Sequence, residues 1–101
     1  MASPLDGIGL LMSFSRLAAI VAPSYGRWTV AVDGTPWGVT FGQMVTDLTF
    51  SPSGDRVGAL GKQDDKWHVV IDGQTWSNAF DMAWKPVFSA DGRTVAAKVR
   101  K

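Results

Sequence analysis

The sequence predicts an all-β protein, and two observations support this fold class. The first is internal repetition, because two blocks of the chain recur after about 40 residues. The second is composition: all nine acidic residues are Asp, Glu is absent, and 11 residues are Gly. Asp and Gly favour turns, whereas Glu favours helices. Short apolar stretches separated by frequent turns are typical of antiparallel strands.

The repeat is clearest around two Asp-Gly pairs. The stretch Trp28–Trp37 (WTVAVDGTPW) reappears as Trp67–Trp76 (WHVVIDGQTW), 39 residues later. A second block, Phe50–Ala59 (FSPSGDRVGA), reappears as Phe88–Ala97 (FSADGRTVAA), 38 residues later. A repeat of this length with a turn at every step is typical of the four-stranded blades of β-propellers.

Each complete repeat predicts four strands, and the whole chain predicts nine or ten. Residues 8–14 are either a further inner strand or part of a helix over residues 5–20, because their apolar residues fit both periods. Arg16–Ala22 is a weaker copy of Arg56–Lys62 and is therefore expected to be a strand of the same kind. We expect inner strands at 45–50 and 84–88, second strands at 16–22, 56–62 and 93–99, third strands at 27–33 and 66–72, and outer strands at 35–41 and 75–80.

Four short segments predict the hairpin turns. Asp33-Gly34 and Asp72-Gly73 lie between alternating apolar residues, which is typical of tight two-residue turns. Gly34 and Gly73 are therefore expected to have positive φ. Ser51-Pro-Ser-Gly54 and Ser89-Ala-Asp-Gly92 predict slightly longer turns, because their glycines also accept positive φ.

The Phe50–Ala59 and Phe88–Ala97 blocks resemble the Ser-Pro-Asp-Gly repeat of WD-like and TolB-type β-propellers. Val-Val-Ile-Asp-Gly-Gln-Thr-Trp at 69–76, followed by Phe-Ser-Ala-Asp-Gly at 88–92, looks like the propeller-like accessory subunit of the transmembrane electron-transfer complex of sulfate-reducing bacteria. The resemblance covers about residues 13–99. It implies a cytoplasmic subunit of a redox complex that carries no redox cofactor itself. The Trp-Asp dipeptide of true WD repeats and its Gly-His pair are absent.

The chain is interpreted as one propeller-type domain, residues 1–101, with blade parts at 13–41, 45–80 and 84–99. These parts amount to about two and a half blades, whereas a closed ring needs roughly four to eight. Three arrangements follow from the count. The ring is completed by sequence missing from this chain, it is completed by self-association into a trimer or tetramer, or the blades form an open array.

Composition argues against several classes of function. Cysteine is absent, which excludes disulfides and thiolate chemistry. The net charge of +1 is too small to produce the positive electrostatic field that attracts nucleic acid. His68 is the only histidine and is expected to be a strand residue without chemistry. The aspartates considered as calcium ligands lie at predicted turns and do not have calcium-loop spacing; they are Asp33, Asp64, Asp65, Asp72 and Asp91. We therefore expect no catalytic residues, no metal site and no cofactor.

The tryptophans are the candidate contact residues. Trp28, Trp37, Trp67 and Trp76 flank the two Asp-Gly turns, where they are expected to pack on one another and between blades. The functional alternative makes outer-strand Trp37 and Trp76 a rim that contacts a partner protein or a sugar. Trp84 begins an inner strand and is a third candidate contact.

Three functions remain to be compared. The first is a non-catalytic interaction scaffold that binds protein partners, with the accessory subunit of a redox complex as its specific form. The second is a lectin-like propeller that binds a ligand through its tryptophan rim. The third is an enzyme, which the sequence disfavours because acid, base and nucleophile candidates are scattered over separate turns. The apolar stretch 8–21 contains Arg16 and is too short to span a bilayer, so no membrane insertion is expected.

Overall fold

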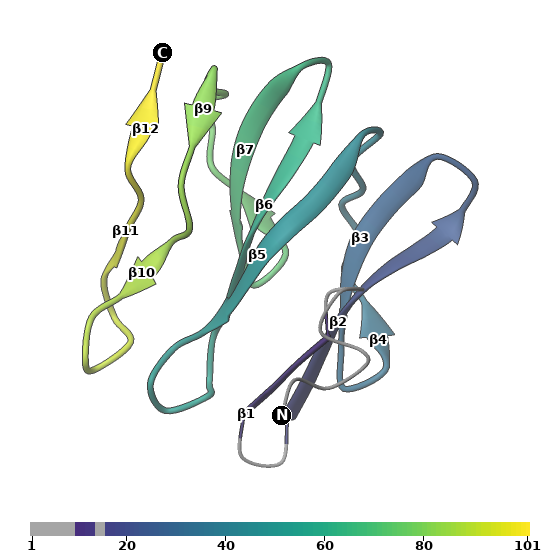
Figure 1. The fold of residues 1–101 in the computed structure, drawn as a ribbon. Coiled ribbons are helices and arrows are strands. Elements are labelled where there is room, and N and C mark those ends of the chain that lie inside the picture. Colours follow the sequence, from purple (N-terminus) through teal and green to yellow (C-terminus); the bar gives the residue numbers. More distant parts are fainter. Residues whose placement is uncertain (1–9, 14–15) are drawn as a thin grey trace, which may run out of the picture.

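The computed structural model describes the backbone of residues 10–13 and 16–101 and the side chains of residues 16–101. Within these residues all regular structure is β-strand, and every strand pair is antiparallel (Figure 1). The all-β prediction is confirmed. The choice between strand and helix near the N-terminus is decided for the described part, because residues 10–13 pair with residues 16–19 as a hairpin. Residues 5–9 and 14–15 of the predicted helical segment lie outside the described residues.

Two four-stranded sheets follow one another along the chain, and in each the strands lie in chain order. In these two sheets the strands predicted at 16–22, 27–33, 45–50, 56–62 and 66–72 agree with the observed ones to within about two residues. The first sheet contains β1 (Leu10–Ser13), β2 (Arg16–Ser24), β3 (Arg27–Val32) and β4 (Thr35–Pro36). The second sheet contains β5 (Met44–Phe50), β6 (Val57–Gln63), β7 (Lys66–Ile71) and β8 (Gln74–Thr75).

The outer strands are shorter than predicted. β4 and β8 have two residues each, whereas strands at 35–41 and 75–80 were expected. Just beyond them the Trp37 and Trp76 N–H groups still donate to the third strands, at Val30 and Val69. The chain then leaves the ladder and pairs again at single bridges, Phe41 with Trp28 and Phe80 with Trp67. In the first sheet the Trp37 side chain reaches the neighbouring sheet.

The C-terminal hairpin contains β9 (Met82–Ala83), β10 (Val87–Phe88), β11 (Val95–Ala96) and β12 (Val99–Arg100). β9 pairs with β12 and β10 pairs with β11, so the strands predicted at 84–88 and 93–99 are not continuous. Trp84, which the sequence places at the start of an inner strand, lies between β9 and β10. Pro86 lies in the break and has no N–H for the ladder. The same place in the second sheet is also irregular, because the register shifts after Thr46 and Asp47 has a φ of 58°. The described residues therefore form twelve strands instead of nine or ten.

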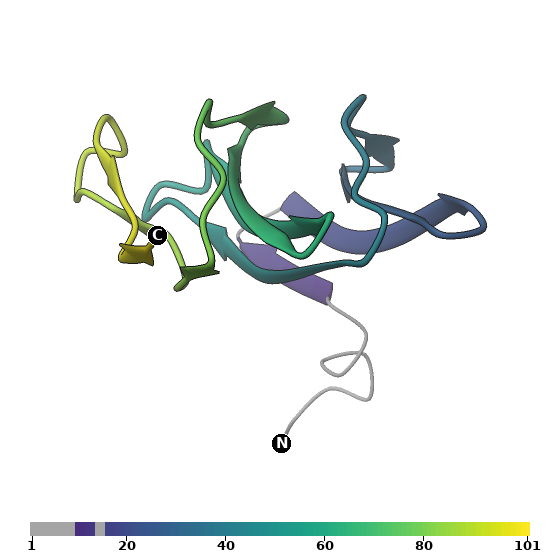
Figure 2. The same ribbon diagram turned by 90° about the horizontal axis from the view of Figure 1, so that it is seen from above.

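The first sheet, the second sheet and the C-terminal hairpin lie side by side in chain order (Figures 1 and 2). We call the face of each unit that points toward the next unit its forward face, and the opposite face its rear face. Two apolar cores lie between the units. The first joins Ala18, Ile20, Val30 and Val32 of the first sheet to Val45, Leu48, Val57, Ala59 and Val70 of the second. The second joins Leu60, Val69 and Ile71 of the second sheet to Ala83, Phe88, Val95, Ala97 and Val99 of the hairpin.

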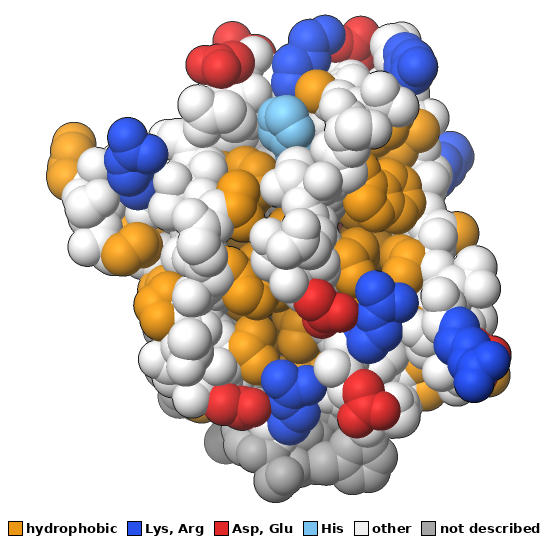
Figure 3. Space-filling view, turned by 180° about the vertical axis from the view of Figure 1, so that it is seen from behind, with side chains coloured by type: hydrophobic (Ala, Val, Ile, Leu, Met, Phe, Trp, Pro, Cys, Tyr) orange, Lys and Arg blue, Asp and Glu red, His pale blue; other side chains and the backbone are white. Residues whose placement is uncertain are grey.

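Strand alternation explains how one sheet contributes to both cores. Along β6, Val57 and Ala59 face the first sheet, whereas Leu60 faces the hairpin. The second sheet is covered on both faces and therefore has apolar residues on both faces. Charged side chains gather toward the two ends of the molecule, and hydrophobic side chains lie in the furrows between the sheets (Figure 3).

Aromatic residues of the first sheet pack on glycines of the second. The Phe41 ring lies where a side chain at residue 61 would stand, because a Cβ on Gly61 would be 2.4 Å from Phe41 Cγ. Trp37 likewise lies over Gly73, with Trp37 Cγ 3.2 Å from the place of a Cβ. Gly61 of β6 and Gly73 in the turn after β7 therefore leave room for aromatic rings of the preceding sheet.

The predicted turns are confirmed. Gly34 and Gly73 have φ values of 86° and 80°, and the preceding Asp33 and Asp72 have φ values of 51° and 52°. Two successive positive φ values define the type I′ turn, whose twist fits antiparallel strands. Gly54 and Gly92 also have positive φ, at 82° and 74°.

Replacing Gly34 or Gly73 by Ala should lower the free energy of unfolding by about 1–2 kcal/mol, because each Cβ must adopt a left-handed backbone conformation. Gly73→Ala should cost more than Gly34→Ala. A new methyl group at residue 73 meets Trp37, whereas nothing lies within 4 Å of one at residue 34. Urea unfolding of both variants measures the difference, and equal stabilities would contradict the packing of Trp37 on the second sheet.

Candidate functional site

An arginine and an aspartate form the same clasp in both sheets. Arg16 Nε donates to Asp33 Oδ2 at 3.1 Å, and Arg56 Nε donates to Asp72 Oδ2 at 3.0 Å. The other carboxylate oxygen of each aspartate accepts a backbone N–H, from Leu17 at 2.9 Å and from Val57 at 2.8 Å. Each clasp therefore ties the start of the second strand to the Asp-Gly turn that ends the third strand.

The same arginines also reach the next unit. Arg16 Nη1 donates to the Gly54 carbonyl at 2.9 Å, and Arg56 Nη1 donates to the Gly92 carbonyl at 3.0 Å. Both carbonyls belong to hairpin turns that link an inner strand to a second strand. The Arg56 guanidinium also lies 5.6 Å from the centre of the Phe88 ring. One side chain thus holds its own sheet closed and fixes the next unit against it.

The clasp in the first sheet affects acid–base behaviour. The Leu17 N–H, and next the Arg16 guanidinium, lower the pKa of Asp33 below its ordinary value of 3.8. Ser89 lowers the pKa of Asp91 in the same way, by donating its hydroxyl within the C-terminal hairpin turn. Lys66 lowers the pKa of Asp81 through an ion pair. Each interaction stabilises the ionised carboxylate.

The three candidate tryptophans lie in three different units. Trp37 and Trp76 are half-buried and pack against the first and second cores. Their backbone N–H groups donate to Val30 and Val69, each at 2.8 Å. Trp84 is 41% exposed, and Lys98 Nζ lies 4.9 Å from its ring centre. Trp84 is thus the most accessible of the three.

The sequence predicts that the tryptophans pack on one another, but the contacts observed for Trp37 and Trp67 are with other residues. Lys62 Nζ lies 5.5 Å from the centre of the Trp67 ring, and Trp37 lies on Gly73. Within the described side chains the close aromatic pair is Phe41 with His68, at 5.9 Å between ring centres. His68 therefore packs between sheets, as a strand histidine would.

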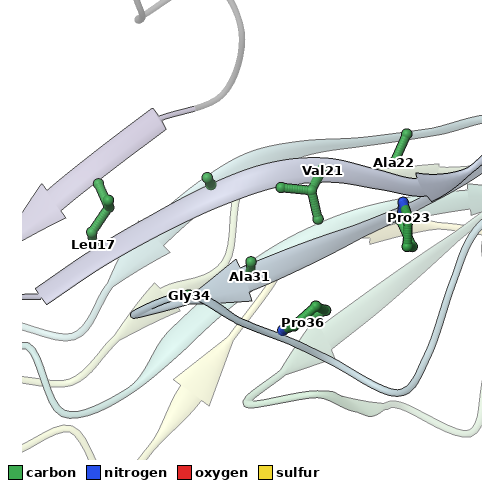
Figure 4. A pocket seen from close by; sticks show the side chains of 8 residues that line it. Leu17, Val21, Ala22, Pro23, Ala31, Gly34 and Pro36 are labelled. Carbon is green, nitrogen blue, oxygen red and sulfur yellow. The ribbon is translucent and has the colours of Figure 1, made fainter.

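The rear face of the first sheet carries a shallow apolar groove. Its lining comes from β2, β3, β4 and the turn between β3 and β4 (Figure 4). Leu17 in this groove is 38% exposed, whereas its repeat equivalent Val57 is 1% exposed. Residues that line the groove include Leu17, Ala19, Val21, Ala31 and Gly34.

Residues 16–101 contain no group of three His, Cys, Asp or Glu side chains arranged to hold a metal ion. Over the same described part of the chain, no helix has the length and apolarity to cross a bilayer. Ser51 is 2% exposed and its hydroxyl accepts the Arg56 N–H at 3.0 Å. This serine therefore acts within its turn.

No protein-family model matches the chain, and no curated protein and no solved structure is significantly similar to it. The propeller resemblance of the sequence accordingly remains an expectation. Any statement of function must rest on the repeated geometry.

The arginine clasps are the feature that sequence reasoning missed. Arg16 and Arg56 occupy matching places in the repeat, and so do Asp33 and Asp72. These matching charges were visible in the alignment of the repeats. Pairing them required knowing that the second strand begins beside the end of the third.

Replacing Arg56 by Lys should lower the free energy of unfolding by about 1 kcal/mol, because a lysine cannot bond the Asp72 carboxylate and the Gly92 carbonyl in the same fork. The value is modest because the Arg56 and Asp72 side chains are 35% and 42% exposed. Arg93→Lys, at an exposed position in the C-terminal hairpin turn, is the matched control. Equal urea midpoints for the two variants would contradict the clasp.

Acid should destabilise the protein in part through Asp33. Because its folded pKa lies below 3.8, its contribution is complete above that value and is lost as the pH falls through the folded pKa. Asp33→Asn, which tolerates the positive φ, should reduce the loss of stability on acidification below about pH 4. Urea unfolding between neutral and acidic pH measures this. The effect should survive high salt, because the main cause is a hydrogen bond.

Proposed function

We propose that this chain is a non-catalytic interaction module built from β-propeller blades. The observation that carries the proposal is the repeated unit: four antiparallel strands in chain order, joined by tight turns and packed face to face on the next unit. This is the construction of propeller blades. Further blades, from other copies or from additional sequence, complete the ring.

The surface supports a binding role better than a catalytic one. The carboxylates of Asp33 and Asp72 are engaged by arginines, and His68 packs on Phe41. Titratable groups with free, convergent positions are what an active site requires. The exposed large apolar residues include Trp84 and Val87, which suit contact with a protein partner. A cytoplasmic accessory subunit of a redox complex is the specific form of this proposal.

The alternative is a lectin-like propeller. Trp84 favours it, because an exposed indole is a common platform for the apolar face of a sugar ring. The neighbouring Lys98 supplies a polar group beside that platform. Trp37 and Trp76, both half-buried, offer less indole surface to a ligand.

The purified chain should capture a protein partner in co-purification with solubilised membrane and redox complexes, and it should be negative on a glycan array. Trp84→Ala should weaken capture, whereas Trp28→Ala, which removes another exposed indole, should not. A positive glycan array with quenching of tryptophan fluorescence, lost in Trp84→Ala, would support the lectin instead. If the chain captured no protein and bound no glycan, the proposal that it is an interaction module would be contradicted.

A further inference from the structure

We infer that the rear face of the first sheet is a docking site for the forward face of the C-terminal hairpin of a second copy of this chain. The inference rests on the proposed blade architecture and names the surfaces by which blades of different copies meet. It follows from the rule that both internal interfaces obey.

The rule is that a forward face always packs on a rear face. The forward face of the first sheet covers the rear face of the second, and the forward face of the second covers the rear face of the hairpin. The chain therefore has one rear face and one forward face that no described unit covers. They lie at opposite ends of the row of units (Figure 2).

The uncovered rear face matches a covered one position by position. In the repeat, the groove residues Leu17, Ala19 and Ala31 correspond to Val57, Ala59 and Val70. These three equivalents are at most 1% exposed, because the first sheet packs on them. The groove therefore has apolar residues at the same positions at which the rear face of the second sheet contacts the first sheet.

The covered rear face of the second sheet has two glycines on which aromatic rings pack, and the groove has glycine at one of the two equivalent positions. Gly34 corresponds to Gly73, on which Trp37 packs. Nothing lies within 4 Å of the place of a Cβ at Gly34. Val21 of the first sheet corresponds to Gly61 of the second, on which the Phe41 ring packs. Because valine has a side chain, an incoming aromatic ring cannot approach the backbone as closely at Val21. The rear face of the first sheet therefore fits an occupant that has no phenylalanine at this place.

The C-terminal hairpin is such an occupant. Within the described residues its forward face has no third strand, no outer segment and no counterpart of Phe41. It presents Val87, which is 65% exposed, and Trp84. Val87 corresponds to Thr49, and Thr49 Cγ2 lies 3.3 Å from the place of a Cβ on Gly58, on the forward face of the second sheet. This correspondence places Val87 on the uncovered forward face.

The contact should be weaker than the internal ones. Lys98 stands where the second sheet has Leu60, and Thr94 stands where it has the clasping Arg56. Half of a sheet also buries less area than a whole one, and small interfaces give transient association. We therefore expect copies to associate head to tail at high protein concentration and to separate on dilution.

The test measures particle mass by sedimentation equilibrium up to about 1 mM protein. The wild-type chain should associate reversibly. Leu17→Lys in the groove and Val87→Lys on the hairpin should each weaken association at least about tenfold, because each buries an unpaired charge. Tyr25→Lys adds the same charge in the β2–β3 turn, at a fully exposed residue, and should associate as the wild type does. Circular dichroism confirms that each variant is folded.

A mixture of the two lysine variants decides the pairing. Each variant retains one intact face, so together they should form particles of two chains and nothing larger. A monomeric wild type at 1 mM, unchanged association of either lysine variant, or a mixture that stays monomeric would overturn the inference. None of these results bears on partner capture or glycan binding, so the proposed function would stand or fall separately.

Discussion

Packing between successive sheets is the constraint on which the rest of this structure depends. A four-stranded antiparallel sheet has two faces, and an isolated sheet of this size buries neither of them. Here each sheet is apolar on both faces, and the middle sheet is covered on both by its neighbours in the chain. The unit of stability is therefore a pair of adjacent sheets, as in other repeat architectures.

This constraint explains the placement of glycine in β6. Gly61 has no side chain because the Phe41 ring occupies that space, and a Cβ there would lie 2.4 Å from the ring. The close approach lets one large aromatic residue fill the gap between two twisted sheets. No described unit of this chain packs on the rear face of the first sheet, and there the equivalent residue is Val21.

The polar contacts serve the same interface from its edge. Arg16 and Arg56 each bond a carboxylate of their own sheet and a turn carbonyl of the next unit. Such hydrogen bonds add modest free energy at partly exposed positions, but they are directional. Apolar packing alone tolerates sliding of one sheet over another, whereas a fork fixed to a particular carbonyl does not. The arginines thus specify how the sheets are aligned.

The sequence by itself determined the all-β class, the period of the repeat and the turns, because these depend on local properties. Asp33-Gly34 and Asp72-Gly73 need positive φ whatever surrounds them, and alternation along 66–71 specifies two faces. Tertiary structure decided the rest. The outer strands end early, and in the first sheet the Trp37 side chain packs on Gly73 of the next unit. The exposure of Trp84 and the pairing of Arg56 with Asp72 likewise depend on residues distant in the chain. Such contacts have no local signal, because their free energy exists only once the sheets have met.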